Sequence, residues 1–153
     1  MTVNPIPADY PRVIPYLSVD GAAAAIDFYT KVLGAKERMR MGGPDGKIGH
    51  AELDIGDSVV MLADAMDGMG QPDPKSIGGT PVTVMVYVED VDNVFKTAIA
   101  AGATEQRPVE DQFYGDRAGS FADPFGHIWF VASHVEDVSP EEMEKRAAAM
   151  GGS

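Results

Sequence analysis

The chain has 153 residues, a length that suits one domain or two small halves sharing a core. Its formal net charge is −12, with 24 acidic and 12 basic residues and no basic cluster, so we expect neither nucleic acid nor an anionic membrane as a partner. Cysteine is absent, which excludes disulfides, thiolate ligands and a cysteine nucleophile. No apolar run could span a bilayer and the first residues do not resemble a signal peptide, so we expect a cytoplasmic location.

The first half of the chain predicts a strand, a helix and three further strands. Residues 13–19 alternate as a strand, and the pattern of residues 22–33 is that of a helix. This helix should end at Gly34, because glycine commonly takes the left-handed conformation that follows a helix. Turn residues then separate three extended segments, at residues 35–41, 48–55 and 58–63.

The second half repeats this order. Residues 82–88 predict a strand, residues 91–102 predict a helix ending in glycine, and extended segments follow at residues 103–109, 114–122 and 128–133. Between the halves, residues 64–80 are rich in Gly, Pro and Asp, which is typical of a linker or mobile loop. At the end of the chain, Ser139 begins a short helix, with proline next and a glutamate completing a capping box.

One offset relates the two halves. Val19 and Val88 lie 69 residues apart, and so do Asp54 and Asp123. The offset therefore fits both the first strand and the final hairpin of each half. A duplication explains it most simply.

Strand alternation assigns side chains to the two faces of each predicted sheet. Valines at every second position of residues 82–88 form a row that we expect under the helix, so the residues between them face the other way. His50 and Glu52 lie two positions apart on one strand, and they share this second face because Ala51 and Leu53 take the helix side. The rest of the second face is mainly apolar and comprises Ile14, Tyr16, Val59, Met61, Thr83, Met85, Tyr87, Ile128 and Phe130.

Several segments resemble a known superfamily. LSVDGAAAAIDFYTKVLGA resembles the opening motif of the vicinal oxygen chelate (VOC) superfamily, which includes glyoxalase I, bleomycin-resistance proteins, fosfomycin-resistance enzymes and extradiol dioxygenases. VYVEDVDNVFKTAIAAGAT and DPFGHIWFVASH resemble its second half. The combination of GHAELDIGDSVVML with EDQFYGDRAGSFADPFGH is most similar to the PhnB-like branch of glyoxalase/bleomycin-resistance-like proteins.

The resemblance implies an α+β fold of paired βαβββ modules, whose curved sheets form a cleft, usually within a homodimer. Whether the modules pair within one chain or swap between two chains is left open. The implied organisation is an N-terminal extension, a first module, a linker loop, a second module, and a C-terminal helix with its tail. These parts are expected at residues 1–11, 12–64, 65–80, 81–135 and 136–153, and the two modules form one VOC domain.

The resemblance also implies where a metal ion would bind. In metalloenzymes of the superfamily, His, Glu or Gln ligands lie on the first and last strands of each module. The matching positions here are Ile14, Met61, Thr83 and Phe130, which offer no good donor for Zn²⁺, Ni²⁺, Fe²⁺ or Mn²⁺. We therefore expect no metal and no other cofactor, which argues against glyoxalase I, dioxygenase and fosfomycin-transferase chemistry.

His50 and Glu52 have three interpretations. They could form a catalytic acid–base pair, because an imidazole changes its charge near neutral pH. They could belong to a displaced metal site, with a third ligand from His127, His134 or a second subunit. They could also simply form a hydrogen bond at a strand edge or subunit contact.

The apolar second face predicts a small-molecule site, although its side chains could instead fill a closed core. Tyr114 and Arg117 lie between glycines, which often mark a bulge or a close approach to a ligand. Alternation places Arg117 in the cleft with Gly119 and Phe121, where it would bind an anionic or carbonyl group. One bulge would exchange it for Asp116, and a structural salt bridge is the alternative.

These observations favour a metal-independent small-molecule-binding protein of the glyoxalase/bleomycin-resistance type, which encloses an apolar or aromatic ligand in resistance or detoxification. The alternative is a glyoxalase-like lyase or isomerase that uses His50 and Glu52. A third possibility, a fragment of a larger detoxification or regulatory complex, draws only on the acidic surface and the terminal helix.

We predict that protein purified without chelators contains no transition metal in stoichiometric amount, because the family ligand positions carry Ile, Met, Thr and Phe. Elemental analysis by mass spectrometry provides the measurement. One equivalent of zinc, nickel, iron or manganese per chain would contradict this prediction.

Overall fold

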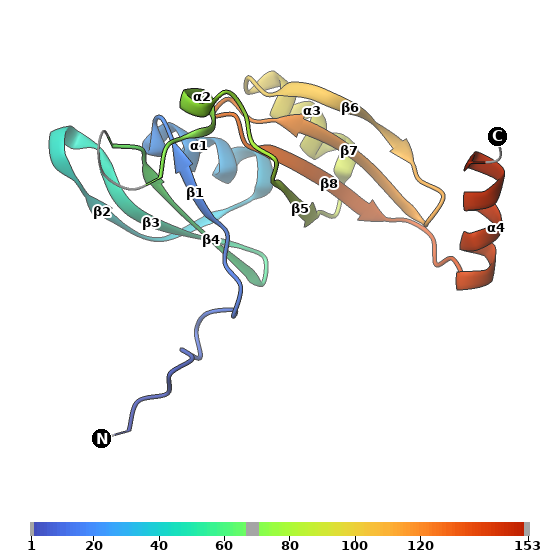
Figure 1. Ribbon diagram of the computed structural model, residues 1–153, viewed down its shortest axis with the longest axis horizontal. Helices are drawn as coiled ribbons and strands as arrows, with labels where there is room; N and C mark the ends of the chain where they lie inside the picture. The colour runs from blue at the N-terminus through green and yellow to red at the C-terminus, as the bar shows by residue number, and fades with distance from the viewer. Residues whose placement is uncertain (1, 67–70, 152–153) are drawn as a thin grey trace. The chain divides into compact units, whose positions relative to one another are not determined.

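The computed structural model describes residues 2–66 and 71–151 (Figure 1). The chain divides into two compact units, each with one four-stranded sheet. Unit 1 extends to Pro81 and includes the segment Pro124–His127, and unit 2 comprises Val82–Asp123 and the chain from Ile128 onward. Among the described residues, no helix combines the length and apolar character needed to cross a membrane.

Unit 1 contains the first strand–helix–strand–strand–strand series. The strand order in its sheet is β1-β4-β3-β2, with β1 parallel to β4 and the other pairs antiparallel. Its elements are β1 (Tyr16–Val19), α1 (Ala22–Leu33), β2 (Lys36–Gly42), β3 (Ile48–Ile55), β4 (Ser58–Asp64) and the short helix α2 (Pro74–Ile77). A single 3₁₀ turn, Pro44–Gly46, connects β2 to β3.

Unit 2 repeats the series with the strand order β5-β8-β7-β6, again with one parallel and two antiparallel pairs. Its elements are β5 (Thr83–Tyr87), α3 (Val91–Ala100), β6 (Thr104–Asp111), β7 (Asp116–Ala122), β8 (Ile128–His134) and the C-terminal helix α4 (Pro140–Gly151). The predicted α+β fold of two βαβββ modules with a C-terminal helix is therefore confirmed.

Two details differ from the expected elements. The first strand begins at Tyr16 rather than at residue 13, although the carbonyl of Pro15 still accepts a hydrogen bond from Met61 N at 2.9 Å. Helix α2 lies within the segment expected to be a linker, and residues 67–70 of that segment lie outside the described residues. The predicted end of α1 is confirmed, because Gly34 has a φ of +68° and donates its N–H to the carbonyl of Tyr29.

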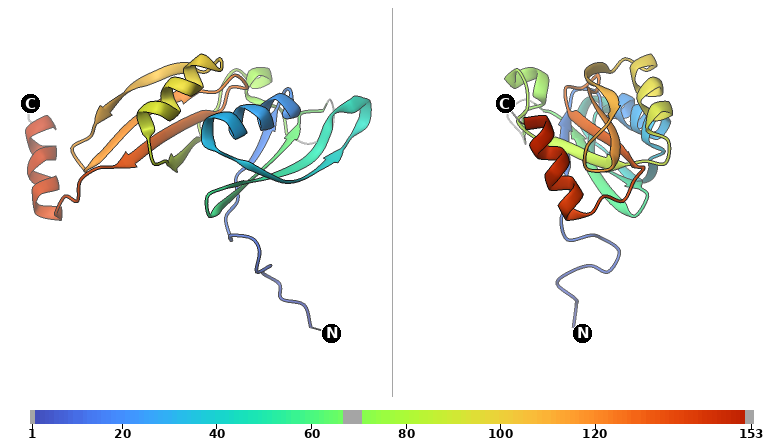
Figure 2. Two further views of the ribbon diagram at one scale, coloured as in Figure 1. Left: turned by 180° about the vertical axis from the view of Figure 1, so that it is seen from behind. Right: turned by 90° about the vertical axis from the view of Figure 1, so that its right-hand side faces the viewer.

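In each unit, one helix covers one face of the sheet (Figure 2). Leu53 and Leu62 are fully buried in unit 1, while the Phe28 ring lies edge-on to Phe125 at 6.3 Å between centroids. In unit 2, Phe95 of α3 packs edge-on against Phe121, with ring centroids 6.1 Å apart. These apolar contacts supply the hydrophobic stabilisation that fixes which face of each sheet points away from the helix.

A polar side chain at the end of the last strand caps the helix in each unit. Asp64 of β4 accepts hydrogen bonds from the backbone N–H groups of Gly21, Ala22 and Ile48 at 2.8–2.9 Å. At the matching position 69 residues later, Ser133 accepts a bond from Val91 N at 3.0 Å. The cap satisfies N–H groups that the first turn of a helix leaves free. Because the pair follows the predicted offset, it supports the duplication.

The offset does not hold on the strand before this one. Glu52 is paired with Met61, whereas Ser120 is paired with Phe130, so the matching positions on β3 and β7 lie 68 residues apart. The β7–β8 connection is therefore one residue longer than the β3–β4 connection. A shift of one residue moves every side chain of a strand to the opposite face. The match of Asp54 with Asp123 consequently gave the wrong faces for β7.

We predict that Asp64→Ala lowers the free energy of unfolding by about 2 kcal/mol at neutral pH, because three backbone N–H groups lose their acceptor. Backbone hydrogen bonds hold the pKa of Asp64 below its ordinary value of 3.8, although burial opposes them. A lowered pKa stabilises the fold above 3.8, and this stabilisation is lost as the pH falls through the lowered value. Urea denaturation of wild type and variant should therefore converge in acid.

The control is Asp27→Ala, which removes an exposed carboxylate on α1 without removing a cap. We expect Asp27→Ala to change stability by less than about 0.5 kcal/mol. Equal effects of the two variants at neutral pH would contradict the capping role of Asp64.

Candidate functional site

The face of each sheet opposite its helix is called here the helix-distal face. In unit 1, Glu52 lies opposite Met61 on one side and Met39 on the other, and Met61 lies beside Tyr16. Directly paired residues share a face, so these side chains form one row across four strands. The predicted orientation of Glu52 away from the helix agrees with this register.

A chain of hydrogen bonds connects the polar residues of this face. The Tyr16 hydroxyl and His50 Nδ1 are 2.7 Å apart, and His50 Nε2 lies 2.8 Å from Glu52 Oε2. The second carboxylate oxygen of Glu52 accepts a bond from the Tyr10 hydroxyl at 2.6 Å. Because a carboxylate only accepts, Nε2 of His50 carries the proton, and in the neutral ring Nδ1 then accepts from Tyr16.

The electrostatics of the chain follow from these contacts. Hydrogen bonds from Tyr10 and His50 lower the pKa of Glu52, so it is a carboxylate at neutral pH. The same bond to Glu52 raises the pKa of Tyr10, and burial raises the pKa of Tyr16. The Arg38 guanidinium lies 4.5 Å from the centre of the Tyr10 ring, which adds a cation–π contact. The segment before β1 is thereby held over Glu52.

In unit 2, a pocket of about 340 Å³ opens on the helix-distal face. Its walls come from β5, β6, β7 and β8, and the lining residues are Thr83, Gln106, Arg107, Ser120, Ile128 and Phe130. Thr83 is paired with Ile128, and Ser120 is paired with both Phe130 and Arg107. Three predicted ligand-binding residues, Thr83, Ile128 and Phe130, therefore lie together.

The sequence analysis missed Gln106, Arg107 and Ser120. Register shifts on both sides of Arg107 interrupt the pairing of β6 with β7, so simple alternation fails there. Pro108 is the sequence signal that could have revealed this bulge, because proline inside a strand is confined to edges and bulges. Gly119 permits the close approach of β6, since a Cβ there would lie 2.9 Å from a methyl group of Val109.

The pocket combines an apolar surface with one cation. Ile128 and Phe130 are half-buried, Thr83 and Ser120 supply hydroxyls, and Arg107 is exposed at the pocket. Within residues 2–66 and 71–151, no carboxylate pairs with the Arg107 guanidinium. The arrangement can therefore accept an apolar group together with an anionic or carbonyl oxygen.

A second polar cluster lies at the other end of this face. The hydroxyl of Tyr87 donates to Asp116 at 2.8 Å, and the same carboxyl group contacts His134 Nδ1 at 2.8 Å. His134 Nε2 lies 2.7 Å from Asp137, and these carboxylates raise the pKa of His134. Tyr114 precedes β7 in a turn, where burial raises its pKa. Tyr87 and Tyr114 do not line the pocket.

The remaining predicted ligand-binding residues are distributed over both units. Met85 lies beside Phe130 and is 42% exposed. Ile14 is half-buried and precedes β1, while Val59 is buried at 3% exposure. Each of these predictions concerns a ligand and stays a prediction.

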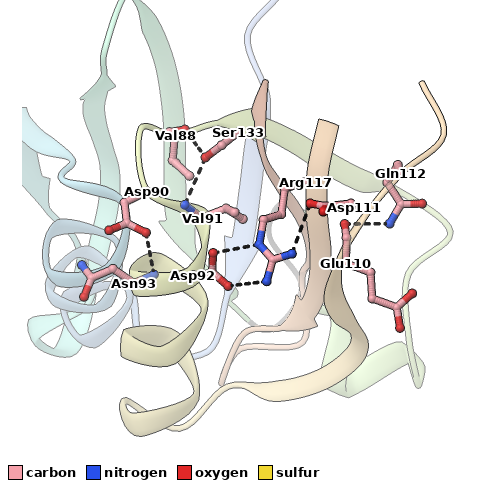
Figure 3. A network of polar contacts seen from close by, with 10 residues as sticks. All are labelled: Val88, Asp90, Val91, Asp92, Asn93, Glu110, Asp111, Gln112, Arg117 and Ser133. Carbon is pink, nitrogen blue, oxygen red and sulfur yellow. Dashed lines mark hydrogen bonds and ion pairs between the residues drawn. The ribbon is translucent and has the colours of Figure 1, made fainter. Parts of the chain in front are cut away.

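The predicted orientation of Arg117 is wrong (Figure 3). Its guanidinium contacts the Asp92 carboxylate of α3 at 2.8 and 2.9 Å, and Asp111 at 3.2 Å. Phe121 is paired with Trp129 on the helix side, and alternation carries Arg117 to that side as well. Asp116 takes the helix-distal side instead, because the longer β7–β8 connection reverses the expected faces.

The family metal positions do not fit a metal ion. Ile14, Met61, Thr83 and Phe130 provide neither imidazole nor carboxylate. His127 Nε2 contacts the carbonyl of Ser18 at 2.8 Å. Within the described part of the chain, no group of three or more His, Cys, Asp or Glu side chains is arranged to hold a metal.

We predict that Arg117→Gln lowers the free energy of unfolding at low salt, because Asp92 and Asp111 lose their cation. High salt should reduce the difference from wild type, since solvent ions screen exposed ion pairs. Urea denaturation at two ionic strengths tests this, with Arg12→Gln as a control that removes the same charge from an exposed site. A difference that does not depend on salt would contradict the ion-pair role.

Comparisons with known proteins complete the description. Uncharacterized proteins from Mycobacterium bovis and Mycobacterium tuberculosis are 46% identical over 144 residues, which cover 92% of this chain and 95% and 85% of theirs. The crystal structure of TioX from Micromonospora sp. ML1 is 29% identical with a TM-score of 0.62, covering 84% of this chain and all of that one.

Two further structures are less similar in sequence. A PhnB protein from Bacillus cereus has a TM-score of 0.63 at 17% identity, covering 80% of this chain and 99% of its own. A fosfomycin resistance protein from Listeria monocytogenes, complexed with Mn(II) and 1S,2S-dihydroxypropylphosphonic acid, has a TM-score of 0.59 at 17% identity, covering 88% and 94%. These two show a shared fold alone. The model of the Glyoxalase/Bleomycin resistance protein/Dioxygenase superfamily matches residues 12–131, and the chain belongs to that family.

Proposed function

We propose that this protein binds a small molecule without a metal ion, and that the pocket of unit 2 holds the ligand. The observation that carries the proposal is the pocket itself, which opens on the helix-distal face and joins apolar side chains to an unpaired cation within the described residues. Its volume of about 340 Å³ lies within the range of small-molecule sites.

The chemistry of the lining defines the ligand class. Phe130 and Ile128 offer apolar contact, and an aromatic ring can stack against Phe130. Arg107 offers planar donors that suit a carboxylate, sulfonate or phosphate oxygen. Thr83, Ser120 and Gln106 supply further hydrogen bonds. The proposed ligand is therefore an apolar or aromatic molecule with one anionic or carbonyl group.

The metal-independent part of the proposal rests on the donor set. The family positions carry side chains that cannot replace the water shell of a divalent transition metal. Apolar contact and hydrogen bonds must then supply the affinity. A role in resistance or detoxification, as a cytoplasmic homodimer, belongs to the same proposal and follows from the family resemblance.

The probe for this site is the aromatic sulfonate 1-anilinonaphthalene-8-sulfonate, whose fluorescence rises in apolar surroundings. We predict that wild type binds it and that Arg107→Gln weakens binding about threefold to fivefold, because water screens a charge at an exposed site. Phe130→Ala should weaken binding further by removing apolar contact. Fluorescence titration supplies the dissociation constants.

The matched control is Arg12→Gln, which removes one exposed arginine from unit 1 and should leave affinity unchanged. Amide chemical shifts locate the probe, and the proposal requires the largest changes at Thr83, Ser120 and Phe130. Shift changes confined to unit 1, or equal affinities of wild type and Arg107→Gln, would contradict the proposed site.

A further inference from the structure

We infer that unit 1 carries a separate acid–base site, in which Tyr16 exchanges a proton with a bound substrate through His50, oriented by Glu52. The inference rests on the hydrogen-bonded chain of the helix-distal face and not on the pocket of unit 2. It therefore goes beyond ligand binding, and it assigns the reacting group to a phenol that no charge or metal accompanies directly.

The burial of the three groups increases away from the surface. Tyr16 is 54% exposed, the His50 side chain is 25% exposed and Glu52 is 7% exposed. A buried carboxylate thus supports a half-buried imidazole, which in turn contacts an accessible hydroxyl. This order is that of a catalytic chain in which the last group meets the substrate and the others act behind it.

The geometry of the chain is preorganised. His50 and Glu52 lie on β3, an inner strand paired on both sides, and the Tyr16 and His50 ring centroids are 5.4 Å apart. The second oxygen of Glu52 is bound by Tyr10, whose ring lies under Arg38. Both oxygens of the carboxylate are therefore engaged, and its position determines the tautomer of His50.

The fold itself does not require this chain. By strand pairing, the residues of unit 2 that match Tyr16, His50 and Glu52 are Met85, Ala118 and Ser120. These side chains cannot form a proton relay, yet unit 2 has the same sheet. A purely structural need would apply to both units. The polar chain of unit 1 therefore answers a demand that unit 2 does not share.

The arrangement is suited to removing a proton from carbon. As the phenol oxygen of Tyr16 takes the substrate proton, its own proton passes to Nδ1 of His50, and the imidazolium is paired with Glu52. The electron pair of the broken C–H bond stays on the substrate. The reverse transfer restores the site. Ordinary pKa values of about 10 for tyrosine and about 6.5 for histidine differ less than those of serine and histidine, so the relay costs less.

The surroundings indicate the substrate class. Met41 is 55% exposed and Met39 is 36% exposed on the same sheet, and Met61 lies directly beside Tyr16. Thioether side chains adapt to apolar molecules of different shape. The substrate is therefore a small apolar carbon acid, with its acidic C–H bond next to an electron-withdrawing group.

The probe reaction is the ring opening of 5-nitrobenzisoxazole, a carbon acid whose C–H proton is taken by a base as its N–O bond breaks to give a coloured phenolate. We expect Tyr16→Phe and His50→Gln each to lower kcat/KM about 100-fold relative to wild type. Glu52→Gln should move the midpoint of the pH profile to lower pH, because the imidazolium loses its carboxylate partner. The titratable and charged groups around His50 are Tyr16 from β1, Glu52 from β3, Tyr10 from the preceding segment, and Arg38 from β2 beside Tyr10.

The matched control is His134→Gln, which removes a strand histidine that contacts carboxylates in unit 2 and should change kcat/KM less than about twofold. Nitrogen chemical shifts provide a readout independent of turnover: wild type should show His50 protonated on Nε2, and Glu52→Gln should lose this preference. Three results would overturn the inference. They are a wild-type rate no higher than that of His50→Gln, full activity of Tyr16→Phe, or a His50 ring protonated on Nδ1.

Discussion

The pairing of each inner strand with its neighbours is the constraint on which the rest of the structure depends. Side chains alternate between the two faces of a strand, so the register decides which residues enter the core under the helix and which remain on the helix-distal face. In unit 1 the register places Leu53 in the core and Glu52 opposite it. In unit 2 it places Phe121 in the core and Ser120 opposite it. Every functional side chain described above inherits its orientation from this choice.

The two modules share an architecture but present different chemistry. The apolar residues under α1 and α3 preserve the sheet, and the caps made by Asp64 and Ser133 preserve the start of each helix. The helix-distal faces are under no such constraint, because they do not hold the helix to the sheet. One has acquired a hydrogen-bonded polar chain, and the other has acquired a pocket with an arginine at a bulge. Duplication followed by divergence of the free face explains both.

The absence of donor side chains at the family metal positions changes what this scaffold can do. A divalent ion would polarise a bound oxygen directly, whereas Ile14, Met61, Thr83 and Phe130 can offer only apolar contact and one hydroxyl. Recognition must then rely on shape, on hydrogen bonds and on single charges such as that of Arg107. Proton transfer must rely on side-chain groups, and Tyr16, His50 and Glu52 are connected in the order that such transfer needs.

The sequence by itself determined the architecture, because hydrophobic periodicity and glycine positions are local signals. They predicted both βαβββ modules, the end of α1 at Gly34, the core position of Trp129, and the shared face of His50 and Glu52. Only the tertiary structure decided which side chains meet. The extra residue between β7 and β8 turned Arg117 toward Asp92, and the bulge in β6 brought Arg107 to Ser120. Tyr10 reaches Glu52 across 42 positions of sequence. Such contacts depend on register and on chain paths through space, which a pattern of neighbouring residues does not contain.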